Sequence, residues 1–311
     1  MTVLITGASG FIGKALLKHM EDNKFNEEHD IILYSAKDNN NYRCINHKGY
    51  IATKNDFIEN GIEHIDVLIH MGASVPKRSV EFGVENTFKF SQNVTNTEWL
   101  LRHLPSVPNK IVFISTVSVY ENVEKIDERT AYQISDMYGA SKLMCEAIIT
   151  EYAKKHKSTL HILRLGQIYG EGEESYNKIV SYFTKQILLG NEITVLGDGN
   201  SVRSMLYVKD CAAYISSAIQ LQESTPTVNI AAGKAISINE IIHIIEKCTG
   251  RQANLHYNKN GVNRSDYYDV TLRDKLFPNI RETDYTDGIG NFCGYYIDKY
   301  KEKGVKSSGS K

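Results

Sequence analysis

The N-terminus joins a short apolar run to a glycine-rich loop, and this combination constrains the fold more than any other feature. Residues 2–6 (TVLIT) have the composition of a buried β-strand. Gly7, Gly10 and Gly13 follow in the spacing G-x-x-G-x-x-G, and a helical pattern comes next. Such glycines allow a tight turn, and a helix N-terminus offers unpaired N–H groups to a pyrophosphate. The segment predicts a dinucleotide-binding strand–loop–helix unit, and a glycine-rich turn without a ligand is the alternative.

Strands and helices alternate over the first half of the chain. The apolar runs predict further strands at 30–35, 64–71, 109–115 and 159–165. Helical patterns occupy about 11–22, 86–103 and 136–155. This alternation favours an α/β fold with a parallel sheet and helices on both faces.

The rhythm changes after Gly166. The patterns predict helices at 176–190 and 208–220 and strands at 193–197 and 227–232. An amphipathic helix is expected over 237–249, because Ser237 and Glu240 have the spacing of a capping box.

The composition excludes several classes of protein. There are 36 Lys and Arg against 37 Asp and Glu, so the net charge of −1 gives no global reason to bind nucleic acid or an anionic membrane. No apolar run approaches the ~20 residues of a membrane helix, and the N-terminus lacks the basic region of a secretory signal. The cysteines are far apart and form no CxxC motif, so we expect reduced thiols in a cytoplasmic protein and no metal site.

Tyr138 and Lys142 in the segment YGASK are four residues apart, which places both on one face of a helix. A phenol has a pKa near 10, too high for efficient proton transfer at neutral pH. A neighbouring ammonium or an oxidised nicotinamide would lower the pKa of the phenol. The pair is therefore a candidate acid–base unit, with an exposed helical pair of no chemical role as the alternative.

Several motifs occur in order between residues 2 and 250. They are GASGFIG, DVLIHMGAS, VFISTVSVYE, YGASK, LRLGQIYG and VLGDGNSVRSMLYVKD. Together they resemble the extended short-chain dehydrogenase/reductase family, the NAD(P)-dependent epimerase/dehydratase group that acts on nucleotide sugars. The resemblance implies a Rossmann-type doubly wound parallel sheet, a smaller C-terminal α/β substrate domain and a homodimer formed through two helices per subunit.

The resemblance also implies the division of the chain. Residues 1–165 and about 205–232 would form the NAD(P)-binding domain. Residues 166–204 and 233–300 would form, approximately, the substrate-binding domain. Residues 301–311 would be a flexible tail.

Three residues match the catalytic residues of that family. Tyr138 would transfer a proton, Lys142 would support it and hold the nicotinamide ribose, and Thr116 would hydrogen-bond the sugar oxygen. A hydroxyl that only satisfies the backbone at a strand end is the alternative for Thr116.

The same resemblance implies binding residues. Cofactor contacts are expected from Gly7, Gly10, Phe11, Ile12, Gly13, Ser35, Lys37, Met71, Gly72, Ala73, Tyr138 and Lys142. Substrate contacts are expected from Ser74, Ser118, Gln167 and Arg203. The Arg203 guanidinium suits a diphosphate, whereas Gln167 stands where the family often has asparagine. Asp210 is expected to cap the helix that follows it, and His70 to be a buried core histidine.

The end of the second strand bears on the choice of cofactor. NAD enzymes usually place an acid there for the ribose 2′-hydroxyl. Here Ser35 stands near that point, no acid occurs until Asp38, and Lys37 and Arg43 could meet a 2′-phosphate. We therefore expect NADP(H) in preference to NAD(H).

The residues after Thr116 bear on the reaction. The sugar 4,6-dehydratases of the family carry Asp-Glu there, whereas this chain has Val117-Ser118. The acid–base pair of GDP-fucose synthase is also replaced, by Ser118 and Gly172. The expected activity is reduction of a 4-keto(-6-deoxy) sugar nucleotide, favoured by the expectation of NADPH. An NAD-dependent nucleotide-sugar 4-epimerase is the alternative, and a non-catalytic dinucleotide sensor is a remote one.

Overall fold

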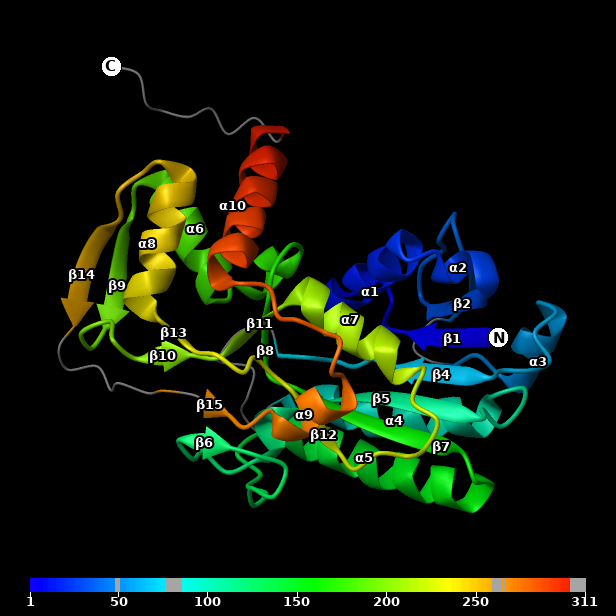
Figure 1. Cartoon of the computed structure of the whole chain (residues 1–311). Coiled ribbons are helices and arrows are strands. Elements are labelled where there is room, and N and C mark those ends of the chain that lie inside the picture. Colours follow the sequence, from blue (N-terminus) through cyan, green and yellow to red (C-terminus); the bar gives the residue numbers. More distant parts are fainter. Residues whose placement is uncertain (48–50, 77–85, 259–264, 266, 303–311) are drawn as a thin grey trace.

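Seven parallel strands form the main sheet of the computed structural model, which describes residues 1–47, 51–76, 86–258, 265 and 267–302. The strands, in spatial order, are β12 (Val228–Ile230), β7 (Thr159–Leu165), β5 (Lys110–Thr116), β4 (Val67–His70), β1 (Thr2–Thr6), β2 (Asp30–Ser35) and β3 (Arg43–Asn46) (Figure 1). Every neighbouring pair is parallel. The carboxyl ends of all seven strands therefore meet at one edge, where ligands bind in sheets of this kind.

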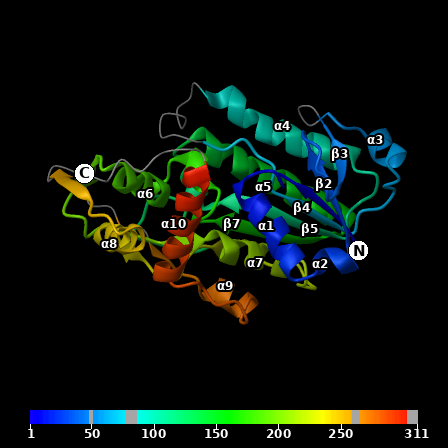
Figure 2. The same cartoon turned by 90° about the horizontal axis from the view of Figure 1, so that it is seen from above.

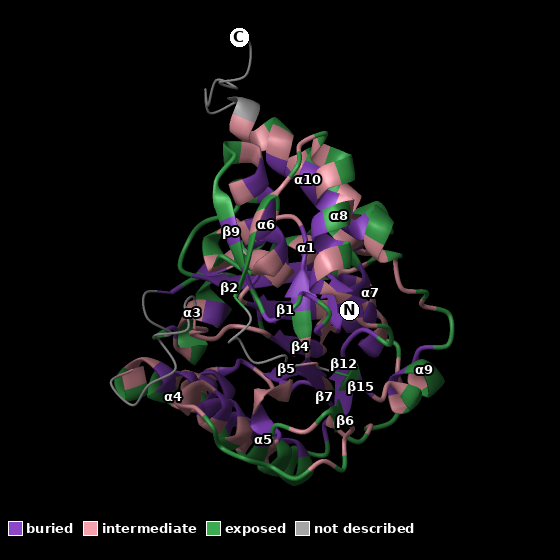
Figure 3. Ribbon diagram, turned by 90° about the vertical axis from the view of Figure 1, so that its left-hand side faces the viewer, coloured by how far each residue is buried: buried purple, intermediate pink, exposed green. Residues whose placement is uncertain are grey.

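Two layers of helices cover this sheet (Figures 1 and 2). The layers are α1 (Phe11–Asp22) with α7 (Val208–Ala218), and α4 (Thr87–His103) with α5 (Met137–His156). Side chains alternate along β1, so Val3 and Ile5 join the core beneath α1 and α7, whereas Leu4 joins the core beneath α4 and α5. The strands are buried between these layers (Figure 3). The predicted doubly wound fold is confirmed.

The apolar runs located most of these elements closely. β1, β2, β7 and α1 have the predicted bounds, and β4, β5, α4 and α5 differ by a few residues. The analysis missed β3 and the short helix α3 (Lys54–Glu59). β3 is an edge strand of four residues, two of which are exposed, so it has no apolar run from which a strand could be predicted.

The remaining elements form small sheets and a helical group. Two-stranded sheets pair β8 (Gln167–Tyr169) with β11 (Met205–Tyr207), β9 (Glu192–Leu196) with β14 (Asn254–Asn258), β10 (Val202–Arg203) with β13 (Ile236–Ser237), and β6 (Lys125–Ile126) with β15 (Tyr267–Tyr268). The helices are α2 (Phe25–Glu28), α6 (Ile179–Leu189), α8 (Ile238–Thr249), α9 (Thr271–Leu276) and α10 (Tyr285–Glu302). Helices α6, α8 and α10 pack on one another.

Two expectations about the C-terminal part meet different outcomes. The capping box at the start of α8 is confirmed, because the Ser237 and Glu240 side chains each bond the other residue's backbone N–H. The tail begins later than predicted, because α10 continues to Glu302, and residues 303–311 lie outside the described residues. Among the described residues, no helix has both the length and the hydropathy of a membrane span.

Candidate active site

The glycine loop brings three backbone segments into close contact. Gly7 has φ +74°, and a Cβ on it would lie 2.8 Å from the backbone nitrogen of Gly72. A Cβ on Gly13 would lie only 2.4 Å from the carbonyl oxygen of Gly7. Gly10 is the N-cap residue of α1, so no side chain caps the helix, and the first turn of α1 contains no acidic residue. The first N–H groups of α1 thus follow a tightly packed glycine loop and have no competing carboxylate in their own turn, which fits a pyrophosphate.

A buried hydrogen-bond chain fixes the loop after β4 beside this cradle. The Thr6 hydroxyl accepts from the backbone N–H groups of Met71 (3.1 Å) and Gly72 (2.8 Å) and lies 2.7 Å from Nδ1 of His70. The other ring nitrogen of His70 lies 2.9 Å from the Thr97 hydroxyl. Burial lowers the pKa of His70 to about 3, so the ring is neutral. The prediction of a core histidine is confirmed.

The end of β5 and the start of α5 hold the predicted catalytic residues. Thr116 ends β5, and its hydroxyl accepts from the backbone N–H of Ser118 (3.2 Å). Asp136 caps α5 by accepting from the backbone N–H of Gly139 (2.6 Å). A Cβ on Gly139 would lie 2.7 Å from the carbonyl oxygen of Ser118, so α5 begins in close contact with this turn. The Tyr138 phenol consequently lies close enough to the Thr116 side chain for Thr116 to lower its pKa.

The electrostatics of Tyr138 differ from the prediction. Burial is the largest influence on its pKa and raises it, and the Asp136 carboxylate raises it further. The interaction with Thr116 lowers it, and Lys142 is not among its largest influences. In the protein alone the pKa of the phenol is therefore raised, not lowered as expected, because burial outweighs the neighbouring groups. The helical spacing predicts that the two residues lie on one face, but it does not indicate how deeply the phenol is buried.

Lys142 is itself almost fully buried. Its Nζ lies 4.1 Å from the centroid of the Phe113 ring. Burial lowers the pKa of Lys142 to about 8, while Cys145 and Glu146 raise it. A lysine in this position can change protonation near physiological pH.

Asn93 on α4 links the loop after β4 to the catalytic helix, and the sequence analysis missed it. Its side chain accepts from the backbone N–H of Ser74 (2.7 Å) and donates to the Ser74 carbonyl (3.1 Å) and the Ser141 hydroxyl (3.1 Å). The Ser141 hydroxyl donates to the Tyr138 carbonyl (2.8 Å). The only signal was an amide side chain on the helical face that also carries Phe90, Thr97 and Leu100.

Ser35 and Arg43, on which the choice between NADP and NAD is based, lie at opposite ends of the sheet. Ser35 ends β2, and its hydroxyl accepts from the backbone N–H of Lys37 (3.2 Å). Arg43 begins β3, opposite Ile32, and lies away from the carboxyl edge. Its guanidinium pairs with Asp30 (2.6 Å) and donates to the carbonyl of Asn60 (2.8 Å). The expectation that Arg43 meets a 2′-phosphate is therefore wrong, because the strand register turns it toward the opposite end.

The expected substrate residues come from four segments. Ser74 lies in the loop after β4, and Ser118 lies two residues after Thr116, a predicted catalytic residue. Gln167 begins β8 and is exposed, and Arg203 ends β10 and is half-buried. Their contacts with a substrate stay predictions.

Asp210 has a structural role that differs from the one predicted. It lies in the first turn of α7, but its carboxylate accepts from the backbone N–H and hydroxyl of Thr283 (2.8 Å each). It therefore holds the segment before α10 and does not cap its own helix.

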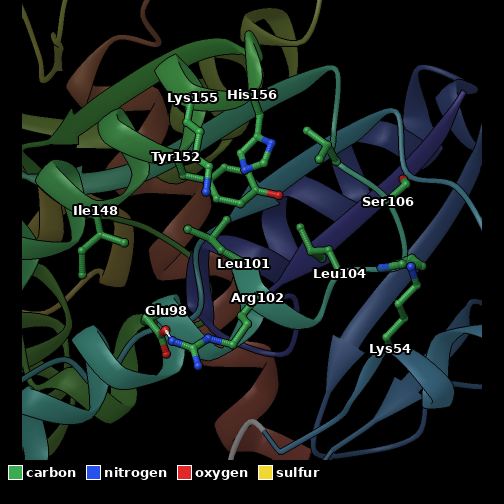
Figure 4. Close-up of a pocket in the computed structure, with 12 residues that line it drawn as sticks. Lys54, Glu98, Leu101, Arg102, Leu104, Ser106, Ile148, Tyr152, Lys155 and His156 are labelled. Atoms are coloured by element: carbon green, nitrogen blue, oxygen red, sulfur yellow. Dashed lines mark hydrogen bonds and ion pairs between the residues drawn. The ribbon is translucent and has the colours of Figure 1, made fainter.

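A separate hollow of about 630 Å³ lies between the C-terminal halves of α4 and α5 (Figure 4). Leu101, Ile148 and Tyr152 contribute to its lining, and the Arg102–Glu98 ion pair borders it. None of the predicted site residues lines this hollow. Over the described ranges, no cluster of three or more His, Cys, Asp or Glu side chains is arranged to hold a metal ion.

Comparison with known proteins finds a family and several relatives that this chain resembles. The model of the "NAD dependent epimerase/dehydratase family" matches residues 3–231. The "Uncharacterized UDP-glucose epimerase YtcB" of Bacillus subtilis (strain 168) is 26% identical over 322 residues, covering 97% of this chain and 99% of that protein.

Two solved structures show the same fold. UDP-glucuronic acid 4-epimerase from Bacillus cereus, in complex with UDP-glucuronic acid and NAD, has a TM-score of 0.81 at 22% identity, covering 96% of this chain and 100% of that chain. UDP-glucose 4-epimerase from Thermotoga maritima, with UDP-glucose, has a TM-score of 0.78 at 20% identity and the same coverage of the two chains.

Proposed function

Because this chain belongs to the NAD-dependent epimerase/dehydratase family, whose enzymes act on nucleotide sugars, we propose that it is an NAD-dependent nucleotide-sugar 4-epimerase. The observation that carries this choice is the position of Arg43, which is bound to Asp30 away from the carboxyl edge. Without Arg43, the expectation of NADPH loses one of the two cations that supported it, and the preference for a reductase loses support with it. The names of the relatives point in the same direction.

The chain's own residues suit oxidation and reduction at one sugar carbon. NAD, when bound, would supply the reversible hydride chemistry needed at C4 of the sugar. Tyr138 would take the proton of the 4-hydroxyl and give it back, and Thr116 would hold the same oxygen. Val117 and Ser118 offer no acid or base for dehydration. The N-terminus of α1 would hold the pyrophosphate and Lys142 the ribose.

Residues 166–204 and 233–300 would form most of the substrate-binding part, with Gln167 and Arg203 in contact with the nucleotide sugar. We place the enzyme in the cytoplasm, which suits its five free thiols.

The purified enzyme is expected to convert UDP-glucose and UDP-galactose into each other with NAD and without net formation of NADH. The C4 hydrogen should return to the same carbon, so no deuterium enters from D₂O. Product analysis by NMR measures both results. Consumption of NADPH with a nucleotide 4-keto-6-deoxyhexose, together with absent epimerisation, would establish the reductase instead.

NAD is expected to bind at least about tenfold more tightly than NADP, a difference of ~1.4 kcal/mol, because Arg43 is bound to Asp30 and does not meet a 2′-phosphate. Calorimetric titration of both cofactors measures this difference. An Arg43→Ala variant should leave the ratio unchanged. A fall in NADP affinity in that variant would show that Arg43 reaches the phosphate after all.

We also propose a homodimer in which the outward faces of α4 and α5 meet. Phe88 on α4 is 78% exposed and Met144 on α5 is 57% exposed, which is unusual for such large apolar side chains. Met144, Ile148 and Tyr152 lie at intervals of four residues and so form one stripe along α5.

Light scattering is expected to give the mass of two chains for the wild type and of one chain for Met144→Glu. A buried carboxylate without a partner is costly enough to break a contact of this kind. Ile58→Glu, which changes an exposed apolar residue on α3, is the matched control and should stay dimeric. An unchanged mass in Met144→Glu would place any subunit contact elsewhere.

A further inference from the structure

One buried carboxylate joins the elements that carry the catalytic residues. Glu146 lies on α5, one turn beyond Lys142, and is 6% exposed. Its Oε1 accepts from the hydroxyl of Ser115 (2.5 Å), the residue before Thr116 on β5. Both carboxylate oxygens also accept from Arg164 on β7, at 2.9 and 2.6 Å. Glu146 thus links α5, the helix with Tyr138 and Lys142, to β5, the strand with Thr116.

Arg164 extends this connection to the loop before α5. Its side chain is 1% exposed, and its Nη2 also donates to the Tyr132 hydroxyl (3.0 Å). The guanidinium centre lies 4.8 Å from the ring centroids of both Tyr120 and Tyr132. The segment that enters α5 at Asp136 is therefore held by the same ion pair. Arg164 also compensates the charge of Glu146 through this ion pair.

The charge of Glu146 acts on Lys142. The titratable groups that act on or are affected by the Lys142 ammonium are Cys145 and Glu146 on α5 and His70 on β4, and the Phe113 ring of β5 faces it. His70 is neutral, and the buried thiol of Cys145 has a raised pKa. Glu146 is therefore the anion in this group that favours the protonated lysine.

We propose that Glu146 is a positioning residue for the reaction, which holds β5 and α5 in register and keeps Lys142 charged, with Arg164 holding the carboxylate in place. The kinetic test of this inference rests on the proposed function, because it measures turnover of the proposed reaction. The catalytic contacts belong to Thr116, Tyr138 and Lys142, and Glu146 acts through them.

The test compares Glu146→Gln with the wild type in the pH dependence of turnover. Glutamine keeps the shape and can still accept from Ser115, but it removes the charge. The basic limb of the profile, where Lys142 loses its proton, is expected to move to lower pH by at least about one unit. An opposite charge at close range changes a pKa by at least about that much. Ser115→Ala is the matched control, because it removes one hydrogen bond and keeps the charge. Its basic limb should stay in place. An unmoved limb in Glu146→Gln, or an equal movement in Ser115→Ala, would overturn the proposal.

Glu146→Gln leaves Arg164 without its partner and could fail to fold. The double variant Glu146→Gln/Arg164→Met removes both charges, and its basic limb should also move to lower pH.

A second measurement does not depend on activity, so it separates a failure of this inference from a failure of the proposed function. Urea unfolding of Lys142→Met, Glu146→Gln/Arg164→Met and the triple variant forms a double-mutant cycle. The effects are expected to be non-additive at pH 7 and to become additive above about pH 9, where Lys142 is neutral in the folded protein. Additivity at both pH values would overturn the coupling.

Discussion

Turnover of the Tyr138→Phe enzyme is expected to be lower than that of the wild type by a factor of about 100 or more, the range set by loss of a general acid–base group. Tyr138 lies beside Thr116 at the carboxyl edge of the sheet, and phenylalanine keeps the ring, whose centroid lies 5.8 Å from that of Phe90. The fold and the affinity for NAD should therefore stay close to those of the wild type. Steady-state kinetics and calorimetric titration of NAD measure the two effects separately.

The control for this substitution comes from the same helix. Tyr152→Phe also removes one phenol hydroxyl from α5, but at the hollow in Figure 4, far along the helix from Thr116. Its turnover should change less than about twofold. Equal turnover in Tyr138→Phe and the wild type would remove Tyr138 from the mechanism and leave the family's chemistry without an acid–base group in this chain.

Gly13→Ala is expected to weaken NAD binding by a factor of about 100 and to lower the free energy of unfolding by roughly 1–3 kcal/mol, as over-packing does. The new Cβ would lie 2.4 Å from the carbonyl oxygen of Gly7 and 2.6 Å from the Cα of Ala8, and both are backbone atoms. α1 must therefore move away from the loop, and its N–H groups move with it. Calorimetry and thermal unfolding with and without NAD measure both changes.

Gly294→Ala is the matched control for the glycine substitution. Gly294 lies within α10, and a Cβ there meets nothing within 4 Å. This change should leave NAD binding unaltered and stabilise the helix by about 0.5–1 kcal/mol. Normal NAD affinity in Gly13→Ala would mean that the cradle does not hold the pyrophosphate.

The sequence by itself determined what depends on neighbouring residues. The apolar run of 2–6 and the glycines after it define β1, the loop and α1, because each of these is a local pattern. The capping box of Ser237 and Glu240 is local too, and the structure has it. The ordered motifs also carried the family, since their residues are contiguous in the chain.

Only the tertiary structure decided which distant residues meet. Arg43 pairs with Asp30 because β3 is parallel to β2 in a register that places Arg43 at the start of the strand. Glu146 reaches Ser115 and Arg164 because β5 and β7 are neighbours beneath α5. Strand order and register arise from the packing of the whole core, and no local period contains them. For the same reason the pKa of Tyr138 could not be inferred from its spacing to Lys142: burial, a property of the folded chain, outweighs the neighbouring charge.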